Sequence, residues 1–165
     1  MKILIAYSSK TGTAKKCAEL LSTELKNHNV SVVDLSNNAP DPSDFDISVI
    51  GGSIRMGKLD KRTKAYISEN KEKLMQENAF YFICNGFHDE TETYFKKNFS
   101  REILSAAQFY DSFGGEMRIA DQKGLDKLIL KMVISANEEE DDFVFPTILT
   151  EAIGRFAQKI KEITK

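Results

Sequence analysis

Residues 3–25 of the chain read ILIAYSSKTGTAKKCAELLSTEL. This stretch opens with an apolar run at residues 3–7, passes through a polar loop rich in hydroxyl groups, and continues into a segment with apolar residues at helical spacing. A nearly continuous apolar run is typical of a strand covered on both faces. The stretch therefore predicts a buried strand, a loop and an amphipathic helix. The helix is expected to bury Ala14, Cys17, Ala18, Leu21 and Leu25.

The same alternation of strand and helix continues along the chain. Residues 47–50 and 80–84 are again apolar throughout and predict two more central strands. Residues 30–32 and 109–113 alternate apolar and polar side chains, which favours strands at the edges of a sheet. Five strands interleaved with helices indicate an open parallel α/β sheet of three layers. Right-handed crossovers favour the strand order 2-1-3-4-5.

Helical patterns fill most of the links between these strands. A weak pattern covers residues 61–74, and one helix before the fifth strand carries Phe95, Phe99 and Ile103. The link from the second to the third strand contains Pro40 and Pro42 and leaves room for only one turn. A C-terminal helix is predicted from one apolar stripe, made of Ile153, Phe156, Ala157, Ile160 and Ile163.

Length and composition restrict the class of protein. A chain of 165 residues, 41% apolar and 29% charged, with a formal net charge of −2, fits a single globular domain over residues 1–165. This charge does not indicate a nucleic-acid-binding surface. No apolar stretch is long enough for a transmembrane segment, and the N-terminal run is too short for a signal peptide. Two isolated cysteines suggest reduced thiols, a cytoplasmic location and no metal site.

A ligand is expected where the order of strands reverses, between the first and third strands. Three loops converge there, at residues 8–14, 53–59 and 85–89. The first loop offers hydroxyl groups, a glycine and the free backbone N–H groups of a helix start, which together suit a phosphate group. The alternative is an ordinary helix N-cap by Thr11 or Thr13. The loop contains neither a Walker A motif nor a dinucleotide fingerprint.

The first loop resembles that of the flavodoxins, which follows the pattern S/T-x-T-G-x-T and binds the phosphate of FMN. Residues 9–13 read SKTGT and match it, with Ala14 at the position where the family prefers threonine. On this resemblance one phosphate hydroxyl is absent, and Thr13 or Ser8 is expected to compensate. The order of strands, helices and loops extends the similarity over essentially the whole chain.

Three further stretches resemble the flavodoxin-like protoporphyrinogen oxidases. Residues 49–58 read VIGGSIRMGK and contain a similar G-x-S-I-R-x-G. Residues 114–118 read GGEMR, and residues 118–142 form an insertion after the fifth strand, with a helical stripe at residues 125–133. The resemblance implies an FMN-dependent redox protein that oxidises a porphyrinogen-like substrate with a quinone acceptor.

The expected cofactor-binding residues follow from the three loops. The phosphate is expected against the first loop and the flavin ring between the second and third. Gly51, Gly52 and Gly57 allow backbone to approach a flat ring closely. Met56 and Phe87 either cover the ring or pack within their loops. The full set is Ser9, Lys10, Thr11, Gly12, Thr13, Ala14, Ser53, Ile54, Arg55, Met56, Gly57, Asn85, Gly86 and Phe87.

Charge near the ring bears on the kind of redox protein. Arg55 and Lys58 lie in the second loop, and a cation beside a flavin favours its anionic reduced form and raises its potential. Carriers of low potential surround the ring with carboxylates instead. Arg55 is otherwise a solvated surface residue, and His88 in the third loop is either a proton donor or simply exposed. No catalytic residue is assigned.

Several functions remain open at this point. An enzyme similar to protoporphyrinogen oxidase is favoured over a generic electron carrier between protein partners. A flavin-free interaction module is a third reading, because the usual aromatic ring-stackers are missing. A signalling receiver domain is disfavoured, since the first and third strands end in hydroxyls and glycines rather than carboxylates. The stripe at residues 125–133 either contacts a membrane surface or packs on its own domain.

Overall fold

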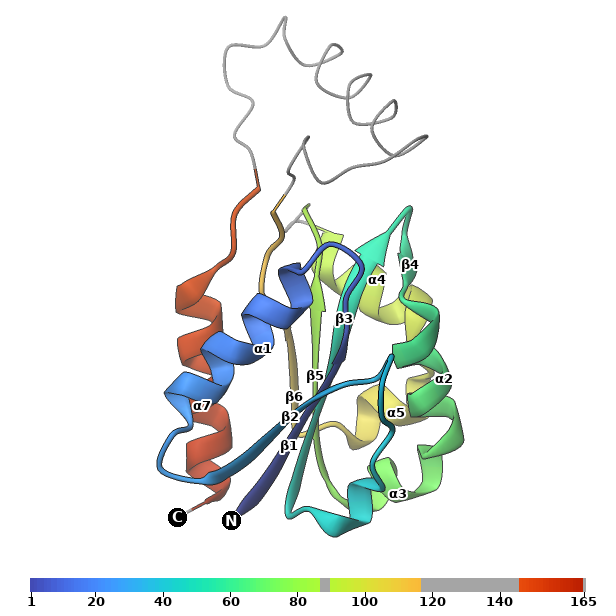
Figure 1. The fold of residues 1–165 in the computed structure, drawn as a ribbon. Coiled ribbons are helices and arrows are strands. Elements are labelled where there is room, and N and C mark those ends of the chain that lie inside the picture. The colour runs from blue at the N-terminus through green and yellow to red at the C-terminus, as the bar shows by residue number, and fades with distance from the viewer. Residues whose placement is uncertain (87–89, 117–145, 165) are drawn as a thin grey trace, which may run out of the picture.

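A parallel sheet forms the centre of the computed structural model, which describes residues 1–86, 90–116 and 146–164 (Figure 1). Its strand order is β2-β1-β3-β5-β6, and neighbouring strands along this path run parallel. The predicted order 2-1-3-4-5 is confirmed. The strands are β1 (Lys2–Ser8), β2 (Asn29–Asp34), β3 (Ile47–Arg55), β5 (Asn78–Cys84) and β6 (Phe109–Ser112).

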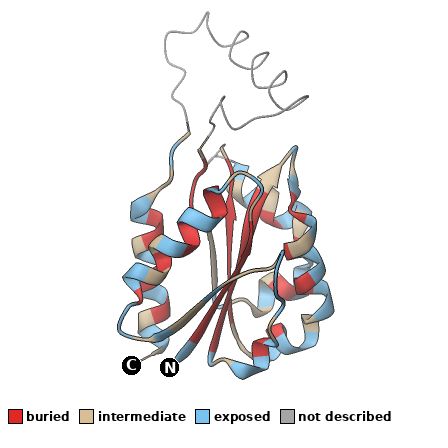
Figure 2. Cartoon of the chain, viewed as in Figure 1, coloured by how far each residue is buried: buried red, intermediate tan, exposed pale blue. Residues whose placement is uncertain are grey.

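The burial of each strand agrees with its sequence pattern. Strands β1, β3 and β5 are almost entirely buried, whereas β2 and β6 are partly exposed at the two edges (Figure 2). A sixth strand was not predicted: β4 (Lys58–Leu59) pairs antiparallel with the end of β3. It converts the start of the second loop into a short hairpin.

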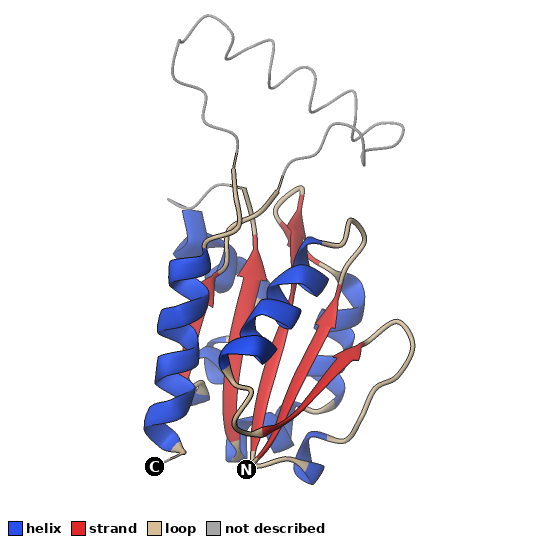
Figure 3. Cartoon of the chain, turned by 60° about the vertical axis from the view of Figure 1, so that its left-hand side comes forward, coloured by secondary structure: helices blue, strands red, loops and turns tan. Residues whose placement is uncertain are grey.

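Helices cover both faces of the sheet and complete the three layers (Figure 3). One face carries α1 (Thr13–Glu24) and α7 (Thr150–Ile163), and their apolar stripes pack on the sheet in one core cluster. A second cluster fills the opposite face. The helices on that face are α2 (Lys61–Glu69), α3 (Lys71–Gln76), α4 (Thr91–Asn98) and α5 (Arg101–Ala106).

The prediction of a single helix before the last parallel strand is wrong in one respect, because the structure has two helices in this segment. Phe95, Phe99 and Ile103 are all buried as predicted, but Phe99 has extended backbone and separates α4 from α5. Ser100 starts the second helix by accepting a hydrogen bond from the Ile103 N–H. The predicted pattern at residues 61–74 is likewise divided, at Asn70.

Two remaining predictions concern connections. The link from β2 to β3 is served by one 3-10 turn, η1 (Pro42–Asp44), as the two prolines predicted. The insertion at residues 118–142 and its stripe at 125–133 lie outside the described residues. The chain on either side of it is described: Gly114 pairs with Ile148 in an antiparallel bridge, and the Leu149 N–H donates to the Phe113 carbonyl at 2.9 Å.

Candidate functional site

The carboxyl ends of β1, β3 and β5 meet at one edge of the sheet, which is the upper edge in Figure 1. The register places Ser8 at the end of β1 beside Gly52, and Ser53 beside Cys84 at the end of β5. The first, second and third loops therefore begin side by side, as the predicted topology requires. The three loops differ in whether their polar groups form hydrogen bonds within the protein.

The first loop leaves its hydrogen-bond donors unpaired. Gly12 occupies the N-cap position of α1 with φ 88°, and no side chain caps the helix. The alternative that Thr11 or Thr13 acts as the N-cap is therefore wrong. Within the described residues, the two threonine hydroxyls and the backbone N–H groups of residues 13–15 have no partner. These groups are the donors that a phosphate dianion requires.

Other residues in and beside the first loop shape this site and set its charge. The Ser9 hydroxyl accepts a hydrogen bond from the Gly12 N–H at 3.0 Å and so folds the loop. The methyl group of Ala14 is buried in the core, which leaves only its backbone N–H to contact a ligand. Lys10 is exposed, and Lys16 pairs with Glu116 at 2.8 Å. No acidic residue occupies the first turn of α1.

Ser8 does not take the role predicted for it. It is fully buried, and its Oγ lies 2.5 Å from the Thr63 Oγ1 on α2. The Thr63 hydroxyl also donates to the Gly51 carbonyl at 2.9 Å, and a hydrogen bond from Ser8 helps to lower the pKa of Asp60. This chain of hydroxyls joins β1, α2 and β3 beneath the loops. The expectation that Ser8 replaces a missing phosphate hydroxyl is therefore wrong.

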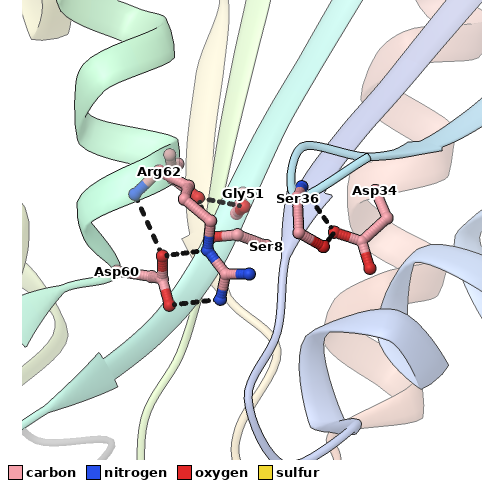
Figure 4. Close-up of polar contacts among 7 residues, drawn as sticks. Ser8, Asp34, Ser36, Gly51, Asp60 and Arg62 are labelled. Atoms are coloured by element: carbon pink, nitrogen blue, oxygen red, sulfur yellow. Dashed lines mark hydrogen bonds and ion pairs between the residues drawn. The ribbon is translucent and has the colours of Figure 1, made fainter. Parts of the chain in front are cut away.

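An ion pair lies beside this chain of hydroxyls (Figure 4). Asp60 caps α2 by accepting from the Arg62 N–H, and its carboxylate binds the Arg62 guanidinium through two contacts of 3.1 Å. Burial raises the pKa of Asp60, but the hydrogen bonds from Arg62 outweigh this and hold it at about 2. The hydrogen bonds to Asp60 in turn raise the pKa of Arg62, and the charge of Asp34, at the end of β2, adds to this.

The second loop is a hairpin with a two-residue turn. Met56 and Gly57 have φ values of 49° and 72°, and Arg55 pairs with Lys58 across them. Positive φ at both central positions is the geometry that hairpin turns favour, because it matches the twist of the strands. Met56 is 78% exposed at the tip, whereas Ile54 and Arg55 are half-buried. The Met56 side chain points to solvent and covers nothing within the described residues.

Gly51 and Gly52 belong to β3 and are accounted for by packing. A methyl group at Gly51 would overlap the ring of Phe82, and one at Gly52 would press on the Thr63 hydroxyl. Of Gly51, Gly52 and Gly57, only Gly57, at the turn, has a positive φ, which favours glycine. Of the three glycines predicted to approach a flat ring, Gly57 alone lies in the loop itself.

The third loop begins with a buried asparagine. The Ser112 hydroxyl donates to the Asn85 Oδ1 at 2.5 Å and accepts from the Gly114 N–H at 3.1 Å. A methyl group at Gly115 would press on the backbone of Asn85 and Gly86. The side chain of Asn85 thus fixes the loop to the end of β6. Phe87 and His88 lie outside the described residues.

One buried hydroxyl between the second and third loops lacks a partner. Ser53 is 8% exposed, and its Oγ forms no hydrogen bond within the described residues. An unpaired buried polar group is unfavourable unless a ligand or another group completes it. Ser53 is one of the residues predicted to bind the flavin ring, so its orphaned hydroxyl fits that prediction.

Sequence reasoning missed the residues that hold the loops from below. Asp60 and Thr63 were not singled out, although an aspartate before a helix is a recognised N-cap signal. No sequence pattern links Ser8 to Thr63, because they are 55 residues apart. Their contact depends on the packing of α2 against the ends of β1 and β3.

The described ranges also bear on metals, membranes and thiols. They contain no group of three or more His, Cys, Asp or Glu side chains placed to hold a metal ion. In these ranges every helix is too short or too polar to cross a bilayer. Cys17 and Cys84 are both buried and free, and the pKa of the Cys84 thiol is raised by its contact with Cys17 and by burial.

Comparison with known sequences identifies relatives over nearly the whole chain. A family model described as flavodoxin domain matches residues 4–143. The protoporphyrinogen IX dehydrogenase [quinone] of Escherichia coli strain K12 is 23% identical over 176 aligned positions, which cover 99% of this chain and 97% of that protein.

Solved structures show the same fold. Oxidised flavodoxin 2 from Bacillus cereus superimposes with a TM-score of 0.59 at 17% identity and covers 99% of both chains. The Fusobacterium nucleatum flavodoxin bound to flavin mononucleotide superimposes with a TM-score of 0.51 at 12% identity, over 98% of both chains. At these identities the structures establish the arrangement of strands and helices, and the chemistry must be argued from the residues of this chain.

Proposed function

This chain belongs to the flavodoxin family, and on that premise we propose that residues 1–165 form one FMN-binding domain of a cytoplasmic oxidoreductase. The observation that carries the proposal is the first loop. Its unpaired hydroxyls and amides lie at the start of α1, where the helix dipole also favours an anion. FMN is a phosphate monoester and fits this set of donors.

The remaining loops fit the other end of FMN. We assign the flavin ring to the space between the second and third loops, against Ser53, Ile54, Arg55, Met56 and Gly57 on one side and Asn85, Gly86 and Phe87 on the other. The orphaned Ser53 hydroxyl supports this assignment, because a heteroatom of the ring would satisfy it. Met56 contributes through its backbone, since its side chain is exposed.

Bound FMN supplies the transfer of one or two electrons. The residues of this chain bind its phosphate, orient its ring and set the charge around it. Arg55 places a guanidinium in the second loop, and a positive charge there stabilises added negative charge on the ring. The half-buried position of Arg55 strengthens this effect relative to a fully solvated cation.

We further propose that the electron donor is a porphyrinogen-like molecule and the acceptor a quinone. The likeness to the Escherichia coli protoporphyrinogen IX dehydrogenase over 99% of this chain supports this substrate class. The cationic second loop also supports it over a carrier of low potential. The described chain that precedes the insertion at residues 118–142 passes Asn85 at Gly115, next to the assigned ring site. Contact of residues 125–133 with a membrane surface stays a prediction.

Two measurements test these proposals in order. The purified protein, or the apoprotein reconstituted with FMN, should be yellow and should release FMN on denaturation. Under anaerobic conditions protoporphyrinogen should bleach the bound flavin, and a quinone should restore its colour. A yellow protein that the porphyrinogen does not bleach would favour a carrier between protein partners. A colourless protein that refuses FMN would favour a flavin-free interaction module.

A further inference from the structure

The hairpin of the second loop is held by one amide side chain, that of Asn98 at the end of α4. Its Oδ1 accepts a hydrogen bond from the Leu59 N–H at 2.8 Å. Its Nδ2 donates to the Gly57 carbonyl at 3.1 Å and to the Tyr94 carbonyl, in its own helix, at 2.9 Å. The oxygen and the nitrogen of this amide therefore both form hydrogen bonds, and together they join the turn, strand β4 and helix α4.

The hairpin itself is short. Two residue pairs connect β3 to β4, Ile54 with Leu59 and Arg55 with Lys58, and beside them the Asp60 N–H donates to the Ser53 carbonyl at 3.1 Å. A two-stranded hairpin of this length is marginally stable by itself. Its turn also holds Met56 at φ 49°, a conformation that residues with a side chain rarely adopt. Within the described residues, Asn98 is bonded to both sides of this turn, at Gly57 and at Leu59.

Asn98 also fixes the second loop to the helix that follows the third loop. Helix α4 begins at Thr91, directly after the third loop, and ends at Asn98. The hydrogen bonds of Asn98 fix the second loop against this helix. The contact of Asn85 with Ser112 separately fixes the start of the third loop.

We propose that Asn98 is a positioning residue for the flavin ring. It holds the Gly57 turn at a fixed distance from α4 and so keeps the space between the second loop and residues 85–86 ready for a flat ring. This inference rests on the proposed FMN function, because it concerns the same site. Asn98 acts on the ring only through the backbone of the second loop.

Asn70 provides a matched control on the same face of the sheet. It follows α2, and its Nδ2 donates to the carbonyl of Tyr66, four residues earlier, at 3.0 Å. Asn98 makes the same bond to Tyr94. Within the described residues, the Asn70 side chain forms no hydrogen bond to the second loop. Replacing Asn70 removes the helix-terminal bond alone.

The test compares Asn98→Ala, Asn98→Asp and Asn70→Ala with the native apoprotein, titrated with FMN and with riboflavin. Asn98→Ala should weaken both ligands by the same factor, about tenfold, because the ring is common to them and the phosphate loop is untouched. Asn98→Asp retains the acceptor for Leu59 and has nearly the same shape, and it should also weaken both. Asn70→Ala should change neither affinity by more than about twofold.

Two further readouts separate positioning from general stability. Amide hydrogen exchange in the ligand-free protein should accelerate at Leu59 in the Asn98→Ala variant and stay slow in Asn70→Ala. The midpoint potential of bound FMN should shift in the Asn98 variants alone. Native-like riboflavin affinity in both Asn98 variants, with faster exchange at Leu59, would overturn the inference and leave the FMN function intact. An equal loss of affinity in Asn70→Ala would overturn it too. A native protein that binds neither ligand would overturn the proposed function, and the inference with it.

Discussion

The first loop and the hairpin tip of the second loop follow neighbouring strands of one sheet but use their polar groups in opposite ways. In the first loop, the hydroxyls of Thr11 and Thr13 have no partner within the described residues. In the second loop, Asn98 binds both the Gly57 carbonyl and the Leu59 N–H. The difference teaches how to assign roles. Under the proposed function, the unpaired donors are where the ligand binds, whereas the paired backbone forms a surface held in shape for it.

The largest effect is expected when the unpaired donors of the first loop are removed. The double variant Thr11→Ala, Thr13→Ala loses two charge-assisted hydrogen bonds to phosphate, worth about 3–6 kcal/mol together. FMN affinity should fall by a factor of about 10² to 10⁴, measured by fluorescence titration of the apoprotein. Riboflavin affinity and the free energy of unfolding should hardly change.

A control for this prediction is Thr93→Ala, which removes an exposed hydroxyl from α4. It should bind FMN as the native protein does. If the double variant also kept native FMN affinity, the first loop would not be the phosphate site. Unpaired donors would then not distinguish a ligand-binding loop from the second loop.

The next effect tests whether the glycines of β3 serve packing. Gly51→Ala places a methyl group into the ring of Phe82 and should lower the free energy of unfolding by about 3 kcal/mol. Gly154→Ala is the matched control, because a methyl group there meets nothing within 4 Å in α7. This control should raise stability by about 0.5–1 kcal/mol. Urea denaturation of both variants checks the pair. A harmless Gly51→Ala would mean that the space beside Phe82 adapts.

The ion pair beneath the loops should contribute less. The pKa of Asp60 is lowered from 3.8 to about 2 in the folded protein, so its charged form favours folding by about 2 kcal/mol at neutral pH. This stability is present above the unfolded pKa near 4 and is lost as pH falls toward 2. Asp60→Asn should therefore be less stable than the native protein at pH 7, and the two should converge near pH 2.

Urea denaturation at pH 7, 4 and 2.5 measures this convergence, with the exposed Asp44→Asn as control. A difference between Asp60→Asn and the native protein that is independent of pH would contradict the assignment of the ion pair to Arg62.

The smallest effect concerns the tip of the hairpin. Met56→Asn creates an Asn-Gly turn, which tolerates positive φ at both positions, and should raise the free energy of unfolding by about 0.5–1 kcal/mol. Because the Met56 side chain is 78% exposed, riboflavin affinity should stay within about twofold of the native value. A tenfold loss in a riboflavin titration would show that this side chain covers the ring after all.

The path of the sheet could be predicted from sequence because it depends on local periodicity. Continuous apolar runs became β1, β3 and β5, and alternating runs became the edge strands. The break between α4 and α5 was missed because Phe95, Phe99 and Ile103 keep a spacing of four across it. Apolar spacing does not reveal that Phe99 is extended while its side chain stays in the core.

The candidate site was predictable in its loops and not in its supports. The first loop follows a recognisable pattern of hydroxyls, glycine and helix start, so the sequence nominates its residues, and their role in binding phosphate stays a prediction. The hairpin was missed because Met56 is not a usual turn residue at positive φ. Asn98 was missed because it is 39 residues from its partner Leu59. Such contacts depend on how α4 packs, which a single sequence does not encode in any short motif.

The central claim is that the first loop binds the phosphate of FMN. The most direct measurement is the pair of affinities of the native apoprotein for FMN and for riboflavin, which differ only by that phosphate. The account predicts that FMN binds at least about a hundredfold more tightly, from two or more charge-assisted hydrogen bonds. Equal affinities for the two ligands would contradict it.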